Sequence, residues 1–90
     1  QLKSVSRVVL IDDDQDVLDS LDFVVSMGRF RTEKFLNPLE VLNRRWTDKA
    51  VCFVTDLAMP HLTGLELFKE LKARQIDHPI LFLTSRGSVA

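Results

Sequence analysis

The sequence predicts an α/β fold, a doubly wound parallel β-sheet with helices on both faces. Short apolar runs alternate with helical patterns along the chain, and the runs at residues 7–11, 51–55 and 80–84 are continuous rather than alternating. Continuous apolar strands are typical of a sheet that is covered on both faces. Strands that alternate with helices indicate βα units with right-handed crossovers, which pair the strands in parallel.

The composition indicates one domain over residues 1–90. Of these residues 46% are hydrophobic and 28% are charged, and the net charge is −1 with a pI near 6.1. This charge balance disfavours direct binding to nucleic acid or to an anionic membrane. No apolar run is long enough to span a bilayer, and the single Cys52 excludes an intramolecular disulfide. We expect Cys52 to be a buried apolar residue of a cytoplasmic protein.

The first part of the chain predicts a strand, a helix and a second strand. Residues 7–11 form the first strand, and a helix follows from about residue 14 to residue 27. The apolar residues of this helix recur at helical spacing and form one inward-facing stripe: Val17, Leu18, Leu21, Val24 and Val25. Gly28 ends the helix. Residues 30–35 mix charged residues with Phe and Thr, which favours a short, partly exposed edge strand.

The second part of the chain continues the same alternation. A capping residue, a proline and an acid at residues 37–40 start a second helix. Residues 51–55 form a second buried strand, and Thr63 with Glu66 has the pattern of a capping box that starts a third helix. Residues 80–84 form a third buried strand. The predicted inward-facing side chains of the two helical regions are Val41, Leu42 and Trp46, then Leu67, Phe68 and Leu71.

Polar side chains stand where the three buried strands end. Asp12 and Asp13 end the first strand, Asp56 ends the second and Thr84 ends the third. The carboxyl ends of parallel strands meet at one edge of the sheet, where ligands gather. Two carboxylates about 4 Å apart repel by roughly 4 kcal/mol at an effective dielectric near 20. Either one carboxyl therefore stays protonated, or a divalent cation such as Mg²⁺ or Mn²⁺ occupies an all-oxygen site.

Two other interpretations account for parts of the acidic run. Asp14 and Asp16 fit the first turn of a helix, where the helix dipole favours anions. Asp12, Asp14 and Asp16 also have the spacing of the first three ligands of an EF-hand calcium loop. An EF-hand needs Gly at its sixth position and Glu at its twelfth, where this sequence has Val17 and Phe23. The calcium interpretation is therefore disfavoured.

Three segments resemble the receiver domain of two-component response regulators. "VVLIDDDQDVLDSL" resembles its first strand and acidic pair, "FVTDLAMPHLTGLELFKEL" its phosphoacceptor strand and following loop, and "PILFLTSRG" its fourth strand. The amino-acid sequences of these segments are most similar to those of nitrogen-fixation and nitrate transcriptional activators. The resemblance implies a flavodoxin-like sheet of strand order 2-1-3-4, with the fifth strand and the last helices missing.

The resemblance also implies a role for each residue at the strand ends. Asp56 would accept a phosphoryl group from a sensor histidine kinase or a phosphotransfer protein. Asp12 and Asp13 would hold Mg²⁺ or Mn²⁺ together with Asp56 and the main-chain carbonyl of Ala58, and Thr84 would be the switch hydroxyl. The domain would relay the signal to a transcriptional output domain and would not itself be an enzyme. Met59 and Pro60 would fix the loop after Asp56, and Gly64 would let the backbone turn into the helix.

The sequence departs from the resemblance at its ends. It starts at Gln1 without an initiator methionine and stops at Ala90, about where a fourth helix should begin, so we expect the N-terminal portion of a longer receiver. The lysine that ends the missing fifth strand in this family is absent, so phosphorylation of Asp56 in this chain should be slow or undetectable. The apolar strand at residues 80–84 would also be an open edge, which invites self-association.

Two alternative functions stay open on the sequence. A haloacid-dehalogenase-type phosphatase also has an Asp nucleophile after its first strand, and its Asp-x-Asp pattern nearly fits Asp12 to Asp14. That pattern needs Thr or Val where this sequence has Asp16. The second alternative is a receiver-like interaction module that does not use phosphorylation.

Overall fold

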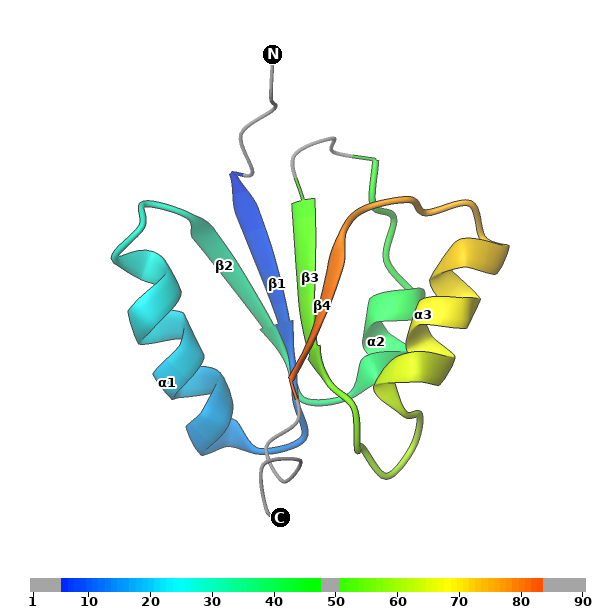
Figure 1. Ribbon diagram of the computed structural model, residues 1–90, viewed down its shortest axis with the longest axis horizontal. Helices are drawn as coiled ribbons and strands as arrows, with labels where there is room; N and C mark the ends of the chain where they lie inside the picture. The colour runs from blue at the N-terminus through cyan, green and yellow to red at the C-terminus, as the bar shows by residue number, and fades with distance from the viewer. Residues whose placement is uncertain (1–5, 48–50, 84–90) are drawn as a thin grey trace.

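The structure is a computed structural model that describes residues 6–47 and 51–83. Its elements in order are β1 (Arg7–Ile11), α1 (Gln15–Ser26), β2 (Arg31–Phe35), α2 (Pro38–Leu42), β3 (Val51–Asp56), α3 (Gly64–Ala73) and β4 (Ile80–Leu83). The strands form one parallel sheet of order β2-β1-β3-β4. Figure 1 shows α1 on one side of this sheet and α2 with α3 on the other. The predicted fold class and strand order are confirmed.

The sheet separates two apolar cores because successive side chains of a strand point to opposite faces. In β1, Val9 and Ile11 face the larger core under α2 and α3, whereas Val8 and Leu10 face the smaller core under α1. The smaller core contains only one fully buried helical side chain, Leu18, with Leu21 and Val25 partly buried beside it. The α1 side of the sheet is therefore the less covered side among the described residues.

Side-chain caps start the helices where the sequence predicted. The carboxylate of Asp14 accepts from the main-chain N–H of Asp16 at 2.9 Å and caps α1. Asn37 caps α2 in the same way. Thr63 and Glu66 form a reciprocal capping box at α3, with distances of 3.1 and 2.9 Å. The starts of these three helices are consequently held by local contacts.

The end of α1 differs from the prediction. The helix ends at Ser26, and the residue in the left-handed conformation is Arg29, with φ 68°, rather than Gly28. The main-chain N–H groups of Gly28 and Arg29 still bond back to the last turn, at 2.9 and 3.0 Å. The turn is therefore one residue longer than a glycine-terminated helix would be.

Burial also differs from the prediction on the α1 side of the sheet. Val24 was predicted to face inward but is 62% exposed, and Cys52 is half-buried rather than buried. Among the described residues β4 is an edge of the sheet, as expected for the strand at residues 80–84 in this chain, and its Leu81 is 58% exposed. Phe68 is half-buried and packs edge-to-face against Phe82 at 6.1 Å. Cys52 and Leu81 stay partly exposed because α1 alone covers their face of the sheet within the described residues, whereas Phe68 lies on α3 on the other side.

An aromatic cluster fills the larger core. Trp46 is buried, donates its indole N–H to the main-chain oxygen of Val41 at 2.8 Å, and packs edge-on against Phe35 and Phe53. A ring nitrogen of His78 lies 3.0 Å from the main-chain oxygen of Trp46. His78 therefore links the segment that leads into β4 to the aromatic cluster.

None of the helices in residues 6–47 and 51–83 combines the length and the apolarity that a bilayer span needs.

Candidate functional site

Three carboxylates converge at the carboxyl edge of the sheet. Asp12 directly follows β1 and Asp56 is the last residue of β3, and these two strands pair in parallel with Ile11 opposite Thr55. One carboxylate oxygen from each of Asp12, Asp13 and Asp56 lies within 4.8 Å of the others. The structure thus brings together the three acids that the sequence predicted as neighbours.

The three acids differ in burial. Asp12 is 3% exposed and Asp56 is 7% exposed, whereas Asp13 lies at the surface. Burial raises the pKa of Asp12 above its ordinary value of 3.8, and the negative charges of Asp56 and Asp13 add to this rise. The main-chain N–H of Asp14 donates to Oδ1 of Asp12 at 2.9 Å and opposes it. Asp12 is therefore an acid whose ionised form needs compensation.

The donor set fits a hard divalent cation. It offers carboxylate oxygens alone, because the cluster contains neither His nor Cys among the described residues. Oxygen ligands of this kind are preferred by Mg²⁺ and Mn²⁺. Two buried carboxylates and a third at the surface would leave one side of the site open to solvent and to a further ligand. A positive charge placed here would offset the repulsion that raises the pKa of Asp12.

We expect the stability of the metal-free chain to depend on pH through Asp12. A carboxyl whose pKa is raised in the folded state holds its proton more tightly there than in the unfolded chain. Its contribution to the free energy of unfolding is fully present below about 3.8 and is lost as pH rises through the raised folded pKa. Chemical denaturation in EDTA at a series of pH values measures this loss.

The matched variant for this measurement is Asp12→Asn, which cannot titrate. Asp19 and Asp22 have lowered pKa values, because hydrogen bonds from Gln15 and Thr32 and from Lys34 favour their ionised forms, and they add stability as pH rises. Subtracting the free energy of unfolding of Asp12→Asn from that of the wild type at each pH cancels the contributions of Asp19 and Asp22. A difference that does not change with pH would contradict the assignment.

The loop after Asp56 is tied to the sheet and to α3. The main-chain N–H of Leu57 donates to the oxygen of Leu83 at 3.1 Å, and that of Gly64 donates to the oxygen of Leu57 at 2.9 Å. Met59 is buried in the larger core and anchors the loop, as the sequence predicted, while Pro60 is exposed. No local sequence signal marked the contact of Leu57 with Leu83, because it joins segments far apart in the chain.

Gly64 has a different role from the predicted one. Within the described residues no glycine has a positive φ, so Gly64 is not needed for an unusual backbone turn. A Cβ at this position would instead overlap the main-chain oxygen of Asp56 and crowd Cα of Leu57 at 3.1 Å. Gly64 therefore lets the first turn of α3 approach the backbone that carries Asp56.

The other two predicted site residues are less defined. Ala58 is exposed and lies two residues after Asp56, so the ligand role of its main-chain carbonyl stays a prediction. Thr84 lies outside the described residues, although Leu83 pairs in register with Asp56.

Residues 8–90 match the response regulator receiver domain family. This chain belongs to that family. The response regulator MprA of Mycobacterium avium (strain 104) is 36% identical over 84 residues, which cover 93% of this chain and 37% of that protein. MprA of Mycobacterium tuberculosis (strain ATCC 25618 / H37Rv) is also 36% identical over 84 residues, and the matched part is 93% of this chain and 36% of that protein. The chain thus spans little more than a third of these curated relatives.

Solved structures of receivers have the same fold. The crystal structure of FixJ-N superposes with a TM-score of 0.84 at 28% identity, and the aligned part is 99% of this chain and 70% of the FixJ-N chain. Full-length FixJ from B. japonicum has a TM-score of 0.77 at 34% identity, with coverages of 97% and 43%. The predicted membership in the receiver family is confirmed, and the phosphatase alternative is not supported. The domain is a regulatory signalling module of a two-component system.

Proposed function

We propose that Asp56 of this receiver domain accepts a phosphoryl group from the phosphohistidine of a sensor histidine kinase or phosphotransfer protein. The observation that carries the proposal is the convergence of Asp12, Asp13 and Asp56 at the carboxyl edge of the sheet. Asp56 ends the central strand β3, and a loop anchored by Met59 holds the backbone that follows it.

The transfer forms one bond and breaks another. An oxygen of the Asp56 carboxylate attacks phosphorus, the nitrogen–phosphorus bond of the phosphohistidine breaks, and the imidazole leaves with the electron pair and takes up a proton. The product is an aspartyl phosphate. Phosphoryl transfer of this kind depends mainly on alignment and on neutralised charge.

The residues around Asp56 supply the alignment. Asp12 and Asp13, with Asp56 and the carbonyl of Ala58, would hold Mg²⁺ or Mn²⁺, which when bound neutralises charge on the phosphoryl oxygens. The N–H of Asp14 orients the carboxylate of Asp12 at 2.9 Å. Thr84 would report the new phosphoryl group to a transcriptional output domain of the parent protein, which would act in the cytoplasm.

The test is a titration of the 90-residue chain with Mg²⁺ and then with Mg²⁺ and beryllofluoride, followed by amide NMR shifts. We expect shifts centred on residues 12–14 and 56–58. Asp56→Asn should weaken Mg²⁺ binding by at least about tenfold. The control Asp77→Asn removes an exposed acid that pairs with Lys72 and should leave the affinity unchanged.

Phosphorylation itself is located by chemistry. After prolonged exposure to acetyl phosphate and Mg²⁺, borohydride trapping and peptide mapping should place any aspartyl phosphate on Asp56. A label on another acid would contradict the assignment. A chain that binds neither Mg²⁺ nor beryllofluoride would favour an interaction module that does not use phosphorylation.

A further inference from the structure

A pocket rich in arginine lies between the ends of α2 and α3. Its volume is about 410 Å³, within the range of small-molecule sites. The residues that line it are Leu42, Arg44, Arg45, Trp46, Thr47, Arg74, Gln75 and Ile76. Three of these side chains are positively charged and no acid of the described residues lines the pocket, although the whole chain has a net charge of −1. A concave site lined by charge of one sign attracts ligands of the opposite sign.

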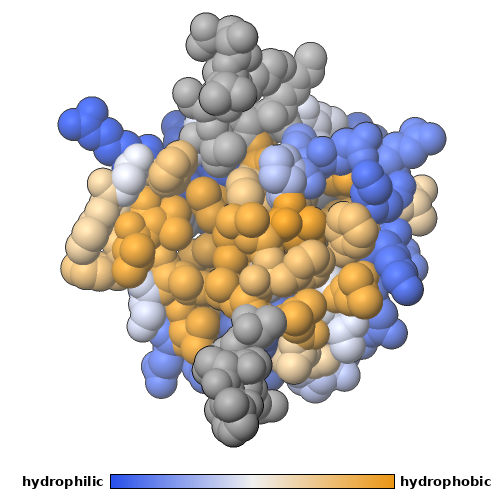
Figure 2. Space-filling model, in the orientation of Figure 1, coloured by the Kyte–Doolittle hydropathy of each residue, from blue (hydrophilic) through white to orange (hydrophobic). Residues whose placement is uncertain are grey.

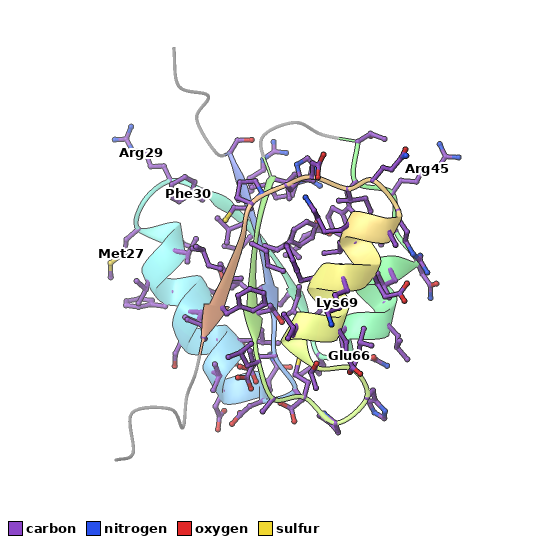
Figure 3. The ribbon with its side chains drawn as sticks, turned by 45° about the vertical axis from the view of Figure 1, so that its right-hand side comes forward. Met27, Arg29, Phe30, Arg45, Glu66 and Lys69 are labelled. Atoms are coloured by element: carbon purple, nitrogen blue, oxygen red, sulfur yellow. The ribbon has the colours of Figure 1, made fainter. Side chains whose placement is uncertain are left out.

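This arginine pocket is remote from the carboxylates of Asp12, Asp13 and Asp56. Helix α3 starts against the backbone of Asp56 and runs back to the opposite edge of the sheet, where the pocket lies. Figure 3 shows Arg45 pointing outward at the end of the α2 and α3 layer opposite to Glu66, which is in the first turn of α3. Figure 2 shows hydrophilic side chains gathered over the end of α3, at the upper right of that view. No residue of β4 lines the pocket, so its walls do not depend on what lies beside that strand.

Two of the three arginines are held in place. The guanidinium of Arg44 lies 4.9 Å from the centre of the Trp46 ring and donates to both carboxylate oxygens of Glu33, at 2.9 and 3.3 Å. Arg74 donates to the main-chain oxygen of Leu42 at 2.7 Å. A guanidinium has five N–H donors, so both side chains keep donors for a ligand. Side chains that are already ordered lose little entropy when they bind.

The third arginine, Arg45, is exposed, and no ion pair engages its side chain within residues 6–47 and 51–83. The acids near the other two arginines offset only part of their charge. Glu33 is shared between Arg44 and Arg7, and Glu70 is a half-exposed partner of Arg74 at 3.7 Å. Exposed pairs of this kind are weak. The pocket therefore keeps a positive charge that an anion can neutralise.

The ends of α2 and α3 bring carbonyl groups close to the pocket, and the negative end of a helix dipole disfavours anions. These carbonyl groups already have donors. The oxygen of Leu42 accepts from Arg74, and the N–H groups of Gln75 and Ile76 donate to the oxygens of Lys72 and Leu71, each at 2.9 Å. The helix ends consequently oppose an anion less than open carbonyl groups would.

We propose that this pocket binds the phosphate group of a small phosphomonoester, with Arg44, Arg45 and Arg74 around the phosphate oxygens. Arginine matches phosphate oxygens in a bidentate geometry. A phosphomonoester carries close to two negative charges at neutral pH, because its second pKa is about 6, whereas a carboxylate carries one. Three arginines without a lining acid fit the higher charge. Leu42 and Ile76 add an apolar wall that suits the organic part of such a ligand.

The experiment titrates the 90-residue chain with phenyl phosphate and follows amide and arginine side-chain NMR shifts. EDTA keeps metal away from Asp56, and the ionic strength is held constant. We expect saturable shifts at residues 42–47 and 74–76 with a dissociation constant of about 1 mM or lower. Arg45→Gln should raise this constant about tenfold, the effect of losing a charge-assisted contact. The matched control Arg29→Gln removes an exposed arginine that does not line the pocket and should leave the constant unchanged.

A diester then tests the charge of the ligand. Methyl phenyl phosphate carries one negative charge, as the phosphates of nucleic acids do, and should bind at least about fivefold more weakly, the effect of one unit charge at about 4 Å in water. Circular dichroism checks that both variants stay folded. Shifts that do not saturate, or that centre on residues 12–14, overturn the proposal. So do equal binding of the diester, and an Arg45→Gln variant that binds as well as Arg29→Gln.

Discussion

Gly64→Ala is expected to lower the free energy of unfolding by roughly 1–3 kcal/mol, the range for an overpacked site. Alanine is the better helix former, so a simple helix argument would predict the opposite sign. The added Cβ overlaps the main-chain oxygen of Asp56, and backbone atoms on both sides leave no flexible group to move. The first turn of α3 or the end of β3 must therefore shift.

The shift should also reach the proposed metal site. Displacing the backbone of Asp56 moves its carboxylate away from Asp12 and Asp13, and we expect Mg²⁺ affinity to fall by about tenfold. Urea denaturation and Mg²⁺ titration measure the two effects. The control is Gly28→Ala, where an added Cβ meets the tip of the exposed Phe30 ring, which can rotate away. An unchanged stability and affinity in Gly64→Ala would show that α3 has room to retreat.

Asp12→Asn is expected to act in opposite directions on stability and on metal binding. Burial and two neighbouring acids make the ionised form of Asp12 unfavourable in the metal-free chain, as its raised pKa indicates. A neutral amide removes that penalty and can still accept from the N–H of Asp14 through its oxygen. We expect the free energy of unfolding to rise at neutral pH without metal by about 0.5–2 kcal/mol, the usual size of a stabilising substitution.

The same change removes one of the carboxylates that we propose for the metal site, so Mg²⁺ affinity should fall by about 10- to 100-fold. Thermal melts with EDTA and with saturating Mg²⁺ give both results in one experiment, because wild type should gain stability from the ion and the variant should not. The control Asp16→Asn removes an exposed acid of the same helix start. A variant that is less stable than wild type in EDTA would contradict the assigned repulsion.

Local signals predicted most of the fold. The caps at Asp14, Asn37 and Thr63 start the helices that the sequence placed there, because each needs only contacts within a few residues. Continuous apolar runs located β1 and β3, which have neighbours on both sides in the sheet. An apolar run also located β4, and its place at the edge of the described sheet was expected from the resemblance, since an apolar run alone does not say whether another strand lies beside it.

The candidate site also has one part that the sequence predicted and another that depends on tertiary packing. Asp12, Asp13 and Asp56 could be grouped from the sequence, because parallel strands bring their carboxyl ends to one edge whatever the details of packing. The tight approach of Gly64 to Asp56 had no local signal, since it depends on how closely α3 packs on the end of β3. The link from Leu57 to Leu83 likewise exists only once β4 lies beside β3.

By itself the sequence determined the order of strands and helices, the receiver family and the three acids of the site. These follow from periodicity, caps and strand-end chemistry, which act over short stretches of chain. Which apolar side chains stay exposed depends on how the helices pack on the sheet, and this could not be read from the sequence. Val24 of α1 and Leu81 of β4 look like core residues in the sequence, but within the described residues α1 is the only helix on that side of the sheet and leaves both side chains exposed.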